Sequence, residues 1–262
     1  MFRSLYTAAS GMTAQQTNLD NVANNLANAN TTGFRKRRVQ FQDLIYQNMV
    51  TPGAAATQQT VSAGLQIGMG TRSAATEILQ TQGDFQQTGN SLDVAIQGLG
   101  YFQVLTPNGQ TAYTRGGSFH LDSQGNVVTS DGDALQPAIT IPANATAITI
   151  GADGTVTVTI PNQTQSQQIG QIQLATFPNP GGLNSIGANL LLPTSSSGDP
   201  IVGTPGGTEG MGTLVQGSLE QSNVNTVEEF IQMILAQRSY EANSQVAKAA
   251  DQMFQEVNQL GK

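Results

Sequence analysis

Three polar residues near the middle of the chain have the types found in a nucleophilic triad: Ser118, His120 and Asp122. At alternate positions of a strand they would share one face, with neighbours on that face about 6.5–7 Å apart. A nucleophile and its base must lie about 3 Å apart. Since this distance is not met, we interpret His120, the only histidine in the chain, as a solvent-exposed strand residue.

Two further patterns fail the tests for ligand sites. Asp122, Asp131 and Asp133 do not have the spacing of a calcium-binding loop, and turn chemistry accounts for them. Gly98-Leu99-Gly100 lacks the third glycine and the following helix of a dinucleotide-binding motif. No carboxylate pair stands out for acid-base work on a glycan, although folding can bring distant carboxylates together. The sequence therefore predicts no catalytic residue, no cofactor and no metal site, and we expect a building block and not an enzyme.

The composition favours this interpretation. Only 10% of the 262 residues are charged, whereas about 25% is usual. Weak charge repulsion suits close packing of identical copies. The net charge of −7 argues against a nucleic-acid partner. Because the chain has no cysteine, disulfides, thiolate chemistry and most zinc sites are excluded.

The C-terminal stretch from Asn225 to Leu260 is predicted to be one long amphipathic helix. Asn225 is placed to cap it, with Glu228 completing a capping box, and the preceding Asn223 offers a further capping side chain. At about 50 Å long, the helix needs a partner for its apolar stripe. The alternative is a surface helix that covers the chain's own core. Stripe residues expected at subunit interfaces are Val227, Ile231, Ile234, Met253, Val257 and Leu260.

A matching helix is predicted from about Ser4 to Asn30. Large apolar residues recur every seven positions, and small or polar residues follow each of them by four, which is a heptad pattern that faces a partner helix. Gly33 is expected to end the helix in a left-handed conformation, with Phe34 packing back on its last turn. The two series are Leu5, Met12, Leu19 and Leu26, expected at subunit interfaces, and Ala9, Gln16, Ala23 and Asn30.

The basic run Arg35-Lys36-Arg37-Arg38 follows this helix. So short a run is most simply a solvated surface, and the alternative is a patch that pairs with acidic groups of neighbouring subunits. Nucleic-acid binding ranks third, because no aromatic residues are interleaved. Polar residues from Gln15 to Asn18 argue against a secretory signal. No stretch is apolar enough for direct membrane insertion.

Between the two helices the pattern changes to that of β structure. From Tyr46 to Thr71, the alternation of Leu65, Ile67 and Met69 predicts an extended arm or hairpin, with a flexible linker as the alternative. Later strands are separated by turns at Gly109, Gly125, Gly132 and Gly154. The predicted strands are Val94–Ile96, Tyr101–Leu105, Ser118–Leu121, Val127–Thr129, Ala147–Ile150, Val156–Ile160, Ile169–Phe177 and Leu214–Leu219.

The expected fold class is α+β, in which N- and C-terminal helices form a coiled-coil-like α region around an inserted, mainly-β region and a β-rich outer domain. The two ends are then discontinuous parts of one helical region. The expected divisions are an N-terminal helix at 1–32, a connecting region at 33–90 with a long arm at 46–71, an outer β domain at 91–197, a return segment at 198–224 and a C-terminal helix at 225–262.

Four segments resemble signatures of one family, the bacterial flagellar rod and hook axial proteins. They are Asn24 to Arg35, Asp93 to Phe102, Tyr113 to Phe119, and a C-terminal signature made of Ser222 to Asn225 with Ala236 to Ser244. The resemblance covers nearly the whole chain, and the distal-rod members are the most similar because of the chain length and the segment at 46–71. The family-motif residues are Asn30, Gly33, Phe34, Asn223, Asn225, Gln237, Arg238, Tyr240 and Glu241.

This resemblance implies a structural subunit that self-assembles into a helical homopolymer, a tube that encloses an export channel and transmits torque across the periplasm. The implied partners are proximal-rod proteins, the hook protein, the P- and L-ring proteins and the flagellar type III export apparatus, which would export the chain without a cleaved signal peptide. The implied location is the basal body, from the periplasm to the outer membrane. Alternatives are another axial protein (proximal rod or hook), a periplasmic glycan-active enzyme and a coiled-coil adhesin.

Overall fold

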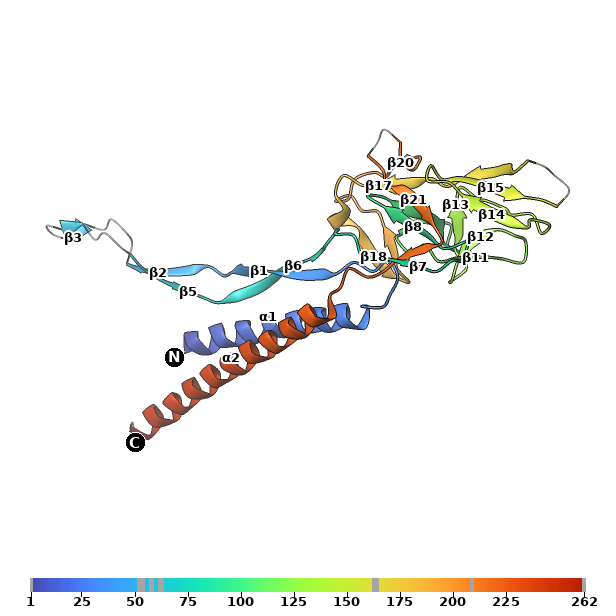
Figure 1. Ribbon diagram of the computed structural model, residues 1–262. Coiled ribbons are helices and arrows are strands. Elements are labelled where there is room, and N and C mark those ends of the chain that lie inside the picture. Colours follow the sequence, from blue (N-terminus) through green and yellow to red (C-terminus); the bar gives the residue numbers. More distant parts are fainter. Residues whose placement is uncertain are drawn as a thin grey trace. The chain divides into compact units, whose positions relative to one another are not determined.

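A computed structural model describes residues 2–50, 55–56, 59–60, 64–161, 165–207 and 210–260 of the chain (Figure 1). The chain divides into two compact units. Unit 1 comprises Met1–Ala27, Arg37–Glu77 and Asn225–Lys262, and unit 2 comprises Asn28–Lys36 and Ile78–Val224. The described residues form an α-helix near each end and many strands between them, which confirms the predicted α+β class.

The two helices are α1 (Phe2–Ala27) and α2 (Thr226–Leu260). The side-chain oxygen of Asn225 accepts hydrogen bonds from the backbone N–H groups of Val227 (3.0 Å) and Glu228 (3.4 Å), so the predicted cap of α2 is confirmed. In contrast, α1 ends before the predicted Asn30, because the chain turns at Asn28 to Asn30.

Gly33 has the expected positive φ of 70°, but the prediction that it stops the helix is wrong. It lies well beyond Ala27, where α1 ends. Its backbone N–H donates to the carbonyl oxygen of Glu220 (2.8 Å). A Cβ atom at this position would lie 2.7 Å from the carbonyl carbon of Arg115. Gly33 is therefore needed for close backbone approach within unit 2.

The rest of unit 1 is an extended two-stranded ribbon (Figure 1). Strand β1 pairs with β6, and β2 pairs antiparallel with β5, with Gln47 opposite Ile67. This confirms a hairpin in the described part of the predicted arm, while residues 51–54, 57–58 and 61–63 of that arm lie outside the described residues. The ribbon's strands are β1 (Arg37–Asp43), β2 (Tyr46–Val50), β3 (Ala55–Ala56), β4 (Gln59–Thr60), β5 (Leu65–Gly68) and β6 (Thr71–Ile78).

Unit 2 is built around a sheet that has nine strands among its described residues, in the order β11-β12-β13-β9-β10-β19-β18, with β17 joining β9 to β20. Antiparallel pairing sets its register, for example Gln103 opposite Tyr113. The strands are β9 (Tyr101–Leu105), β10 (Thr111–Thr114), β11 (Phe119–Leu121), β12 (Val127–Thr129), β13 (Ala134–Gln136), β17 (Leu174–Thr176), β18 (Asn184–Gly187), β19 (Leu190–Leu192) and β20 (Ile201–Gly203).

Smaller sheets complete unit 2. Strands β14, β15 and β16 form one sheet, β8 pairs with β21, and β7 pairs with β22. A short 3₁₀ helix, η1 (Pro180–Gly182), follows β17. The strands are β7 (Phe85–Gln87), β8 (Val94–Gln97), β14 (Ala147–Ile150), β15 (Thr155–Thr159), β16 (Gln167–Gln171), β21 (Thr213–Gln216) and β22 (Ser218–Glu220).

Most predicted strands match the observed ones within a residue or two, and the four predicted turn glycines all have positive φ. Two predictions were too long. The segment Ile169–Phe177 is divided between β16 and β17. The segment Leu214–Leu219 is divided between β21 and β22 at Gly217, whose φ of 74° interrupts the extended backbone.

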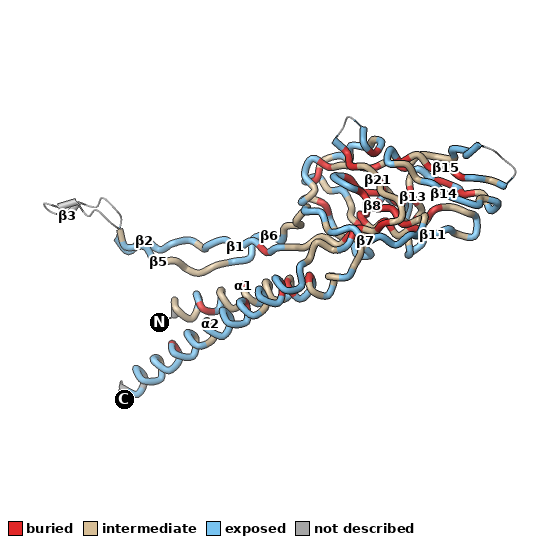
Figure 2. The backbone as a smooth tube through the Cα atoms, viewed as in Figure 1, coloured by how far each residue is buried: buried red, intermediate tan, exposed pale blue. Residues whose placement is uncertain are grey.

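Most buried residues belong to unit 2, where most of the red segments of Figure 2 lie. Phe102 and Phe119 meet edge to face with ring centroids 5.1 Å apart, a favoured aromatic geometry. A second cluster surrounds Phe177, which contacts the rings of Tyr101 and Tyr113. Other core residues include Ile96, Val104, Leu135, Val158, Ile172 and Leu174.

Candidate assembly site

Within unit 1, α1 and α2 pack through small and polar side chains. The residues of α2 that lie on this seam are seven positions apart: Glu229, Ala236 and Ala250 are buried, and Asn243 is half-buried. A Cβ atom on Gly11 of α1 would lie 2.8 Å from the side-chain nitrogen of Asn243. The two helices therefore approach closely because the seam has little side-chain volume.

A polar contact fixes the register of this seam. Asn25 of α1 is 1% exposed, and its side-chain nitrogen donates to a carboxylate oxygen of Glu229 (3.1 Å) and to the carbonyl oxygen of Arg37 (2.8 Å). Its oxygen accepts from the Arg37 N–H (3.0 Å). One side chain thus joins α1, α2 and the first residue of β1. Buried polar residues of this kind specify helix register.

The large apolar residues of α2 lie outside the seam. Val227 is 64% exposed and Ile234 is 55% exposed. The α1 residues expected at an interface, Leu5, Met12, Leu19 and Leu26, are half-buried, whereas Ala9, Gln16, Ala23 and Asn30 are exposed. The side chain of Leu260 lies outside the described part of the chain. Other exposed apolar residues of α2 are Phe230, Ile231, Leu235, Val246, Met253 and Val257.

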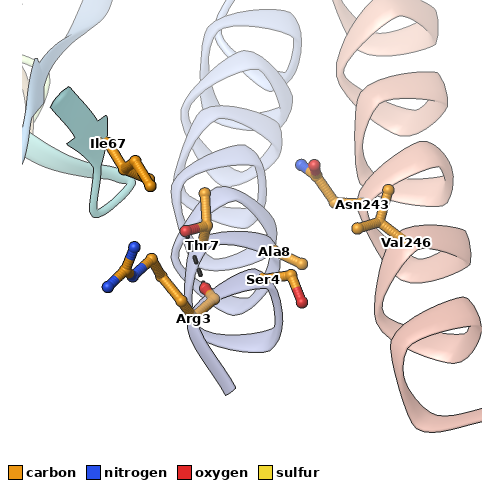
Figure 3. A pocket seen from close by; sticks show the side chains of 8 residues that line it. Arg3, Ser4, Thr7, Ala8, Ile67, Asn243 and Val246 are labelled. Atoms are coloured by element: carbon orange, nitrogen blue, oxygen red, sulfur yellow. Dashed lines mark hydrogen bonds between the residues drawn. The ribbon is translucent and has the colours of Figure 1, made fainter. Parts of the chain in front are cut away.

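A cleft of 930 Å³ opens between α1, α2 and β5 near the beginning of the chain. Figure 3 shows Thr7 and Ala8 from α1, Ile67 from β5, and Asn243 and Val246 from α2 around it. Because the cleft is partly apolar and continues the exposed surface of α2, it belongs to the candidate assembly surface.

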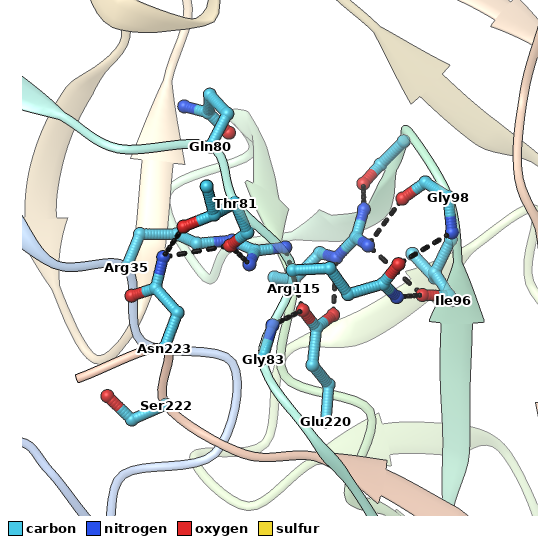
Figure 4. A network of polar contacts seen from close by, with 12 residues as sticks. Arg35, Gln80, Thr81, Gly83, Ile96, Gly98, Arg115, Glu220, Ser222 and Asn223 are labelled. Carbon is cyan, nitrogen blue, oxygen red and sulfur yellow. Dashed lines mark hydrogen bonds and ion pairs between the residues drawn. The ribbon is translucent and has the colours of Figure 1, made fainter. Parts of the chain in front are cut away.

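Unit 2 contains a group of polar residues that we call the anchor cluster: the buried charged residues Arg35, Arg115 and Glu220, and the half-buried amide Asn223 (Figure 4). The carboxylate of Glu220 pairs with a terminal nitrogen of Arg35 (2.8 Å) and with Nε of Arg115 (2.7 Å). The three charged side chains are at most 9% exposed. Two cations thus share one carboxylate in the interior of unit 2.

Further hydrogen bonds compensate the buried charges of the cluster. A carboxylate oxygen of Glu220 also accepts from the N–H of Gly83 (3.1 Å). The guanidinium of Arg115 donates to the carbonyl oxygens of Ile96 (3.0 Å), Gly98 and Gly100. A buried ion pair requires such additional bonds, because desolvation of the charges is costly.

Burial also changes the titration of two members of this region. It lowers the pKa of the Arg35 guanidinium, and the negative charge of Glu220 acts in the opposite direction. Burial raises the pKa of the Tyr101 hydroxyl, against the nearby positive charge of Arg35. That hydroxyl donates a hydrogen bond to the side-chain oxygen of Gln80 (2.8 Å).

The interpretation of the basic run as a solvated surface is wrong for Arg35, whose side chain is buried against Glu220 of the same chain. It is right for Arg38, which pairs with Glu77 at 2.8 Å on an exposed surface. The difference arises because residues Asn28–Lys36 belong to unit 2, which places Arg35 beside Glu220, whereas the chain returns to unit 1 at Arg37. Sequence could not show this, since the acid partner lies far along the chain.

The side-chain amide of Asn223 binds two other segments of the chain, at Lys36 and at Leu79 to Thr81. Its oxygen accepts from the N–H of Lys36 (2.6 Å). Its nitrogen donates to the carbonyl oxygens of Leu79 (3.1 Å) and Thr81 (2.8 Å) and to the Thr81 hydroxyl (3.0 Å). The sequence had suggested Asn223 as a helix cap, so this role was missed. Arg35 donates to the same Thr81 carbonyl oxygen.

Of the other motif residues, Gly33 and Phe34 contact the cluster through their backbones. Phe34 is half-buried, and its carbonyl oxygen accepts from the N–H of Asn223 (3.4 Å). Whether Phe34 packs on the last turn of α1 remains a prediction. The side chains of Asn30 and Asn225 are exposed, as are four residues on α2: Gln237, Arg238, Tyr240 and Glu241.

The polar residues first considered for catalysis have structural roles in unit 2. The carboxylate of Asp122 accepts from the backbone N–H groups of Gln124 (2.7 Å) and Asn126 (2.8 Å), which confirms turn chemistry. His120 is exposed and lies 3.5 Å from the Ser130 hydroxyl. In the described part of the chain, acidic residues and histidine nowhere gather in threes as metal ligands do. Neither described helix combines the length and apolar character of a membrane span.

Three segments of the chain match families of flagellar axial proteins. Residues 5–35 match "Flagella basal body rod protein", residues 95–158 match "Flagellar hook protein FlgE/F/G D1 domain", and residues 215–260 match "Flagellar basal body rod FlgEFG protein C-terminal". Each matched segment contains one charged member of the anchor cluster, namely Arg35, Arg115 and Glu220. The fold therefore brings together one charged residue from each of the three regions.

Whole-chain similarity agrees with these matches. The "Flagellar basal-body rod protein FlgG" of Caulobacter vibrioides is 48% identical over 98% of this chain and 99% of its own length. Those of Borreliella burgdorferi and Bacillus subtilis are 48% and 40% identical, each over 99% of both chains. The chain therefore belongs to the family of flagellar basal-body rod proteins, and its predicted role as a structural subunit of the distal rod of the bacterial flagellum is confirmed.

Proposed function

We propose that this subunit polymerises through the exposed apolar faces of α1 and α2. The observation that carries the proposal is the apolar surface of α2, where Val227, Ile231 and Ile234 each expose more than half of their surface. The seam with α1 is already filled by smaller residues, so these side chains need another partner. Burial of apolar surface contributes about 25 cal/mol per Å², and a second copy of the chain is the partner that a polymer supplies.

In the proposed polymer, residues 1–32 and 225–262 form an inner helical layer around an export channel. Residues 33–90 and 198–224 connect this layer to an outer domain at 91–197. The resulting tube would transmit torque across the periplasm. A single copy cannot bury all of its helical surface, so addition of subunits is favoured at a growing end, where other copies are already present.

Family membership implies self-assembly and contact with other flagellar components. Within that setting we propose specific neighbours: proximal-rod proteins at one end of the tube, the hook protein at the other, and the P- and L-ring proteins around it. We propose that the flagellar type III apparatus exports the chain. Residues of α1 and α2, including Leu19 and Ile234, are proposed to contact other copies and not a small-molecule ligand.

The hairpin β2–β5 is proposed to bridge neighbouring subunits and stiffen the tube. Tyr46, Met49 and Leu65 are exposed on it, and an isolated two-stranded hairpin is marginally stable in water. Deletion of residues 46–71 should therefore give a bent or hook-like tube in electron micrographs. A straight rod formed by the deletion variant would contradict this part of the proposal.

The assembly proposal is tested by comparing the full chain with residues 28–224, which lack both terminal helices. Light scattering and negative-stain microscopy at rising concentration should show tubes for the full chain and monomers for the fragment. Circular dichroism of the fragment must show a cooperative melt, so that loss of assembly is not caused by unfolding. Compact monomers of the full chain at all concentrations would refute the proposal and favour helices that only cover their own chain.

A further inference from the structure

The chain passes between the two units at four peptide links, which follow Ala27, Lys36, Glu77 and Val224. Three of these links lie next to residues that the Asn223 side chain binds or next to Asn223 itself. Lys36 directly precedes the second link, Leu79 closely follows the third, and Asn223 closely precedes the fourth. One amide group therefore connects three of the four segments through which the chain passes between the units.

From this convergence we infer that Asn223, supported by the Arg35–Glu220–Arg115 charges, is the force-bearing joint of the subunit. A pull or twist applied to α2 or to the ribbon acts on unit 2 through these covalent links. The hydrogen bonds of Asn223 connect its own segment with those at Lys36 and Leu79, so a force on one of the three is shared by the other two. Asn223 is thus a positioning residue for torque transmission, and this inference rests on the proposed function.

The surrounding contacts support a mechanical role. Glu220 ends β22, which pairs with β7 through Glu220 opposite Phe85, and its carboxylate holds Arg35 and Arg115. The Gln221 N–H donates to the Asp84 carbonyl oxygen (2.8 Å). Along the segment that leads to α2, the strand pairing of β22, the ion pairs of Glu220 and the hydrogen bonds of Asn223 therefore follow one another.

The test is a pulling experiment on the full chain. Because the chain has no cysteine, handles can be attached through Gln232→Cys on α2 and Asn108→Cys in an exposed turn of unit 2. We compare Asn223→Asp with Asn225→Asp in optical tweezers at constant load. Asn223→Asp replaces the amide nitrogen, which donates to two carbonyl oxygens, by an oxygen that can only accept. Asn225→Asp makes the same change of charge at the helix cap, where aspartate is as favourable as asparagine.

We expect Asn223→Asp to shorten the lifetime of the loaded joint at least about tenfold, since the hydrogen bonds donated by the amide nitrogen are lost and the new carboxylate faces the carbonyl oxygens of Leu79 and Thr81. The segment between β22 and α2 should then detach first, which gives a short increase in extension before unit 2 unfolds. Asn225→Asp should retain the wild-type lifetime. Equal lifetimes for both variants, or simultaneous release and unfolding in Asn223→Asp, would overturn the inference. If that variant does not fold, Asn223→Ser takes its place with the same criteria.

A second measurement separates this inference from the assembly proposal. Tubes of Asn223→Asp formed without load should look like wild-type tubes, whereas motors carrying the variant should turn small beads normally and fail with large ones. If the variant motors lost the same fraction of their rotation speed with small and with large beads, the inference about Asn223 would be wrong. Failure of the unchanged chain to form tubes would refute the assembly proposal instead, and the pulling result would still decide the inference.

Discussion

Phe102 and Phe119 in unit 2 are at most 1% exposed, whereas Phe230 and Ile234 on α2 in unit 1 are 52% and 55% exposed. Unit 2 buries its large apolar residues inside itself and is held by ladders of paired strands and by the anchor cluster. Unit 1 uses small residues for its own helix seam and leaves the large ones outside. The contrast indicates that unit 2 is complete as a single copy, while the helices of unit 1 depend on assembly.

The largest expected effect is loss of assembly without loss of folding. Ile234→Asp puts a charge into an apolar contact between copies, where burying an unpaired charge is highly unfavourable. Sedimentation and electron microscopy should show no tubes, while the melting temperature of the unassembled chain stays unchanged. Gln232→Asp, at an exposed polar position of the same helix, is the control and should still assemble. If Ile234→Asp still formed tubes, the exposed apolar surface of α2 would not be needed for assembly, and the proposed contrast between the two units would be wrong.

A core substitution should show the opposite behaviour. Phe102→Ala in unit 2 should lower the free energy of unfolding by about 3–5 kcal/mol, because it leaves a cavity in a fully packed core. Phe230→Ala in the unassembled chain should change it by less than about 0.5 kcal/mol. Denaturant titration of both variants checks this. Similar losses would mean that α2 buries Phe230 within its own chain in solution.

Removal of the shared carboxylate should have the next largest effect. Glu220→Gln should lower the free energy of unfolding of unit 2 by about 2–3 kcal/mol, because it leaves two guanidinium groups buried without a counter-charge. Glu77→Gln, which breaks the exposed pair with Arg38, is the matched control and should leave the denaturation midpoint unchanged. An equal effect of both changes would show that the anchor cluster is no more important than a surface pair.

The cap of α2 should matter less. Asn225→Ala should cost about 1 kcal/mol of helix stability, because the N–H groups of Val227 and Glu228 lose their acceptor. Far-ultraviolet circular dichroism of the unassembled chain should show a reduced helical signal. Asn225→Asp should restore it, and failure of that rescue would mean that the amide has another role.

The smallest effect is expected in the turn after β11 in unit 2. Hydrogen bonds from Asn126 lower the pKa of the Asp122 carboxyl below its ordinary value of 3.8. A depressed pKa in the folded state means that the carboxylate stabilises the fold above the ordinary value, and that this stabilisation is lost as the pH falls through the folded pKa. Melting temperatures below pH 4 should therefore fall slightly less for Asp122→Asn than for the unchanged chain. Identical curves would contradict the assignment.

Local patterns in the sequence were sufficient to predict most of the elements. The cap at Asn225, the heptad spacing of α1, the glycine turns and the alternation at Leu65 and Ile67 depend on residues close together in the chain. Their conformational preferences are therefore readable without tertiary contacts. The same motifs also led to the correct family.

Tertiary structure alone decided which helix face is buried and which residues form the anchor cluster. The predicted apolar series of α1 and α2 and the small-residue seam have the same seven-residue period, so periodicity cannot tell which of them faces the partner helix of the same chain. Arg35, Arg115 and Glu220 lie in three distant parts of the sequence, and each alone looks like an ordinary surface charge. Only the folded chain, by removing them together from water, makes their pairing necessary.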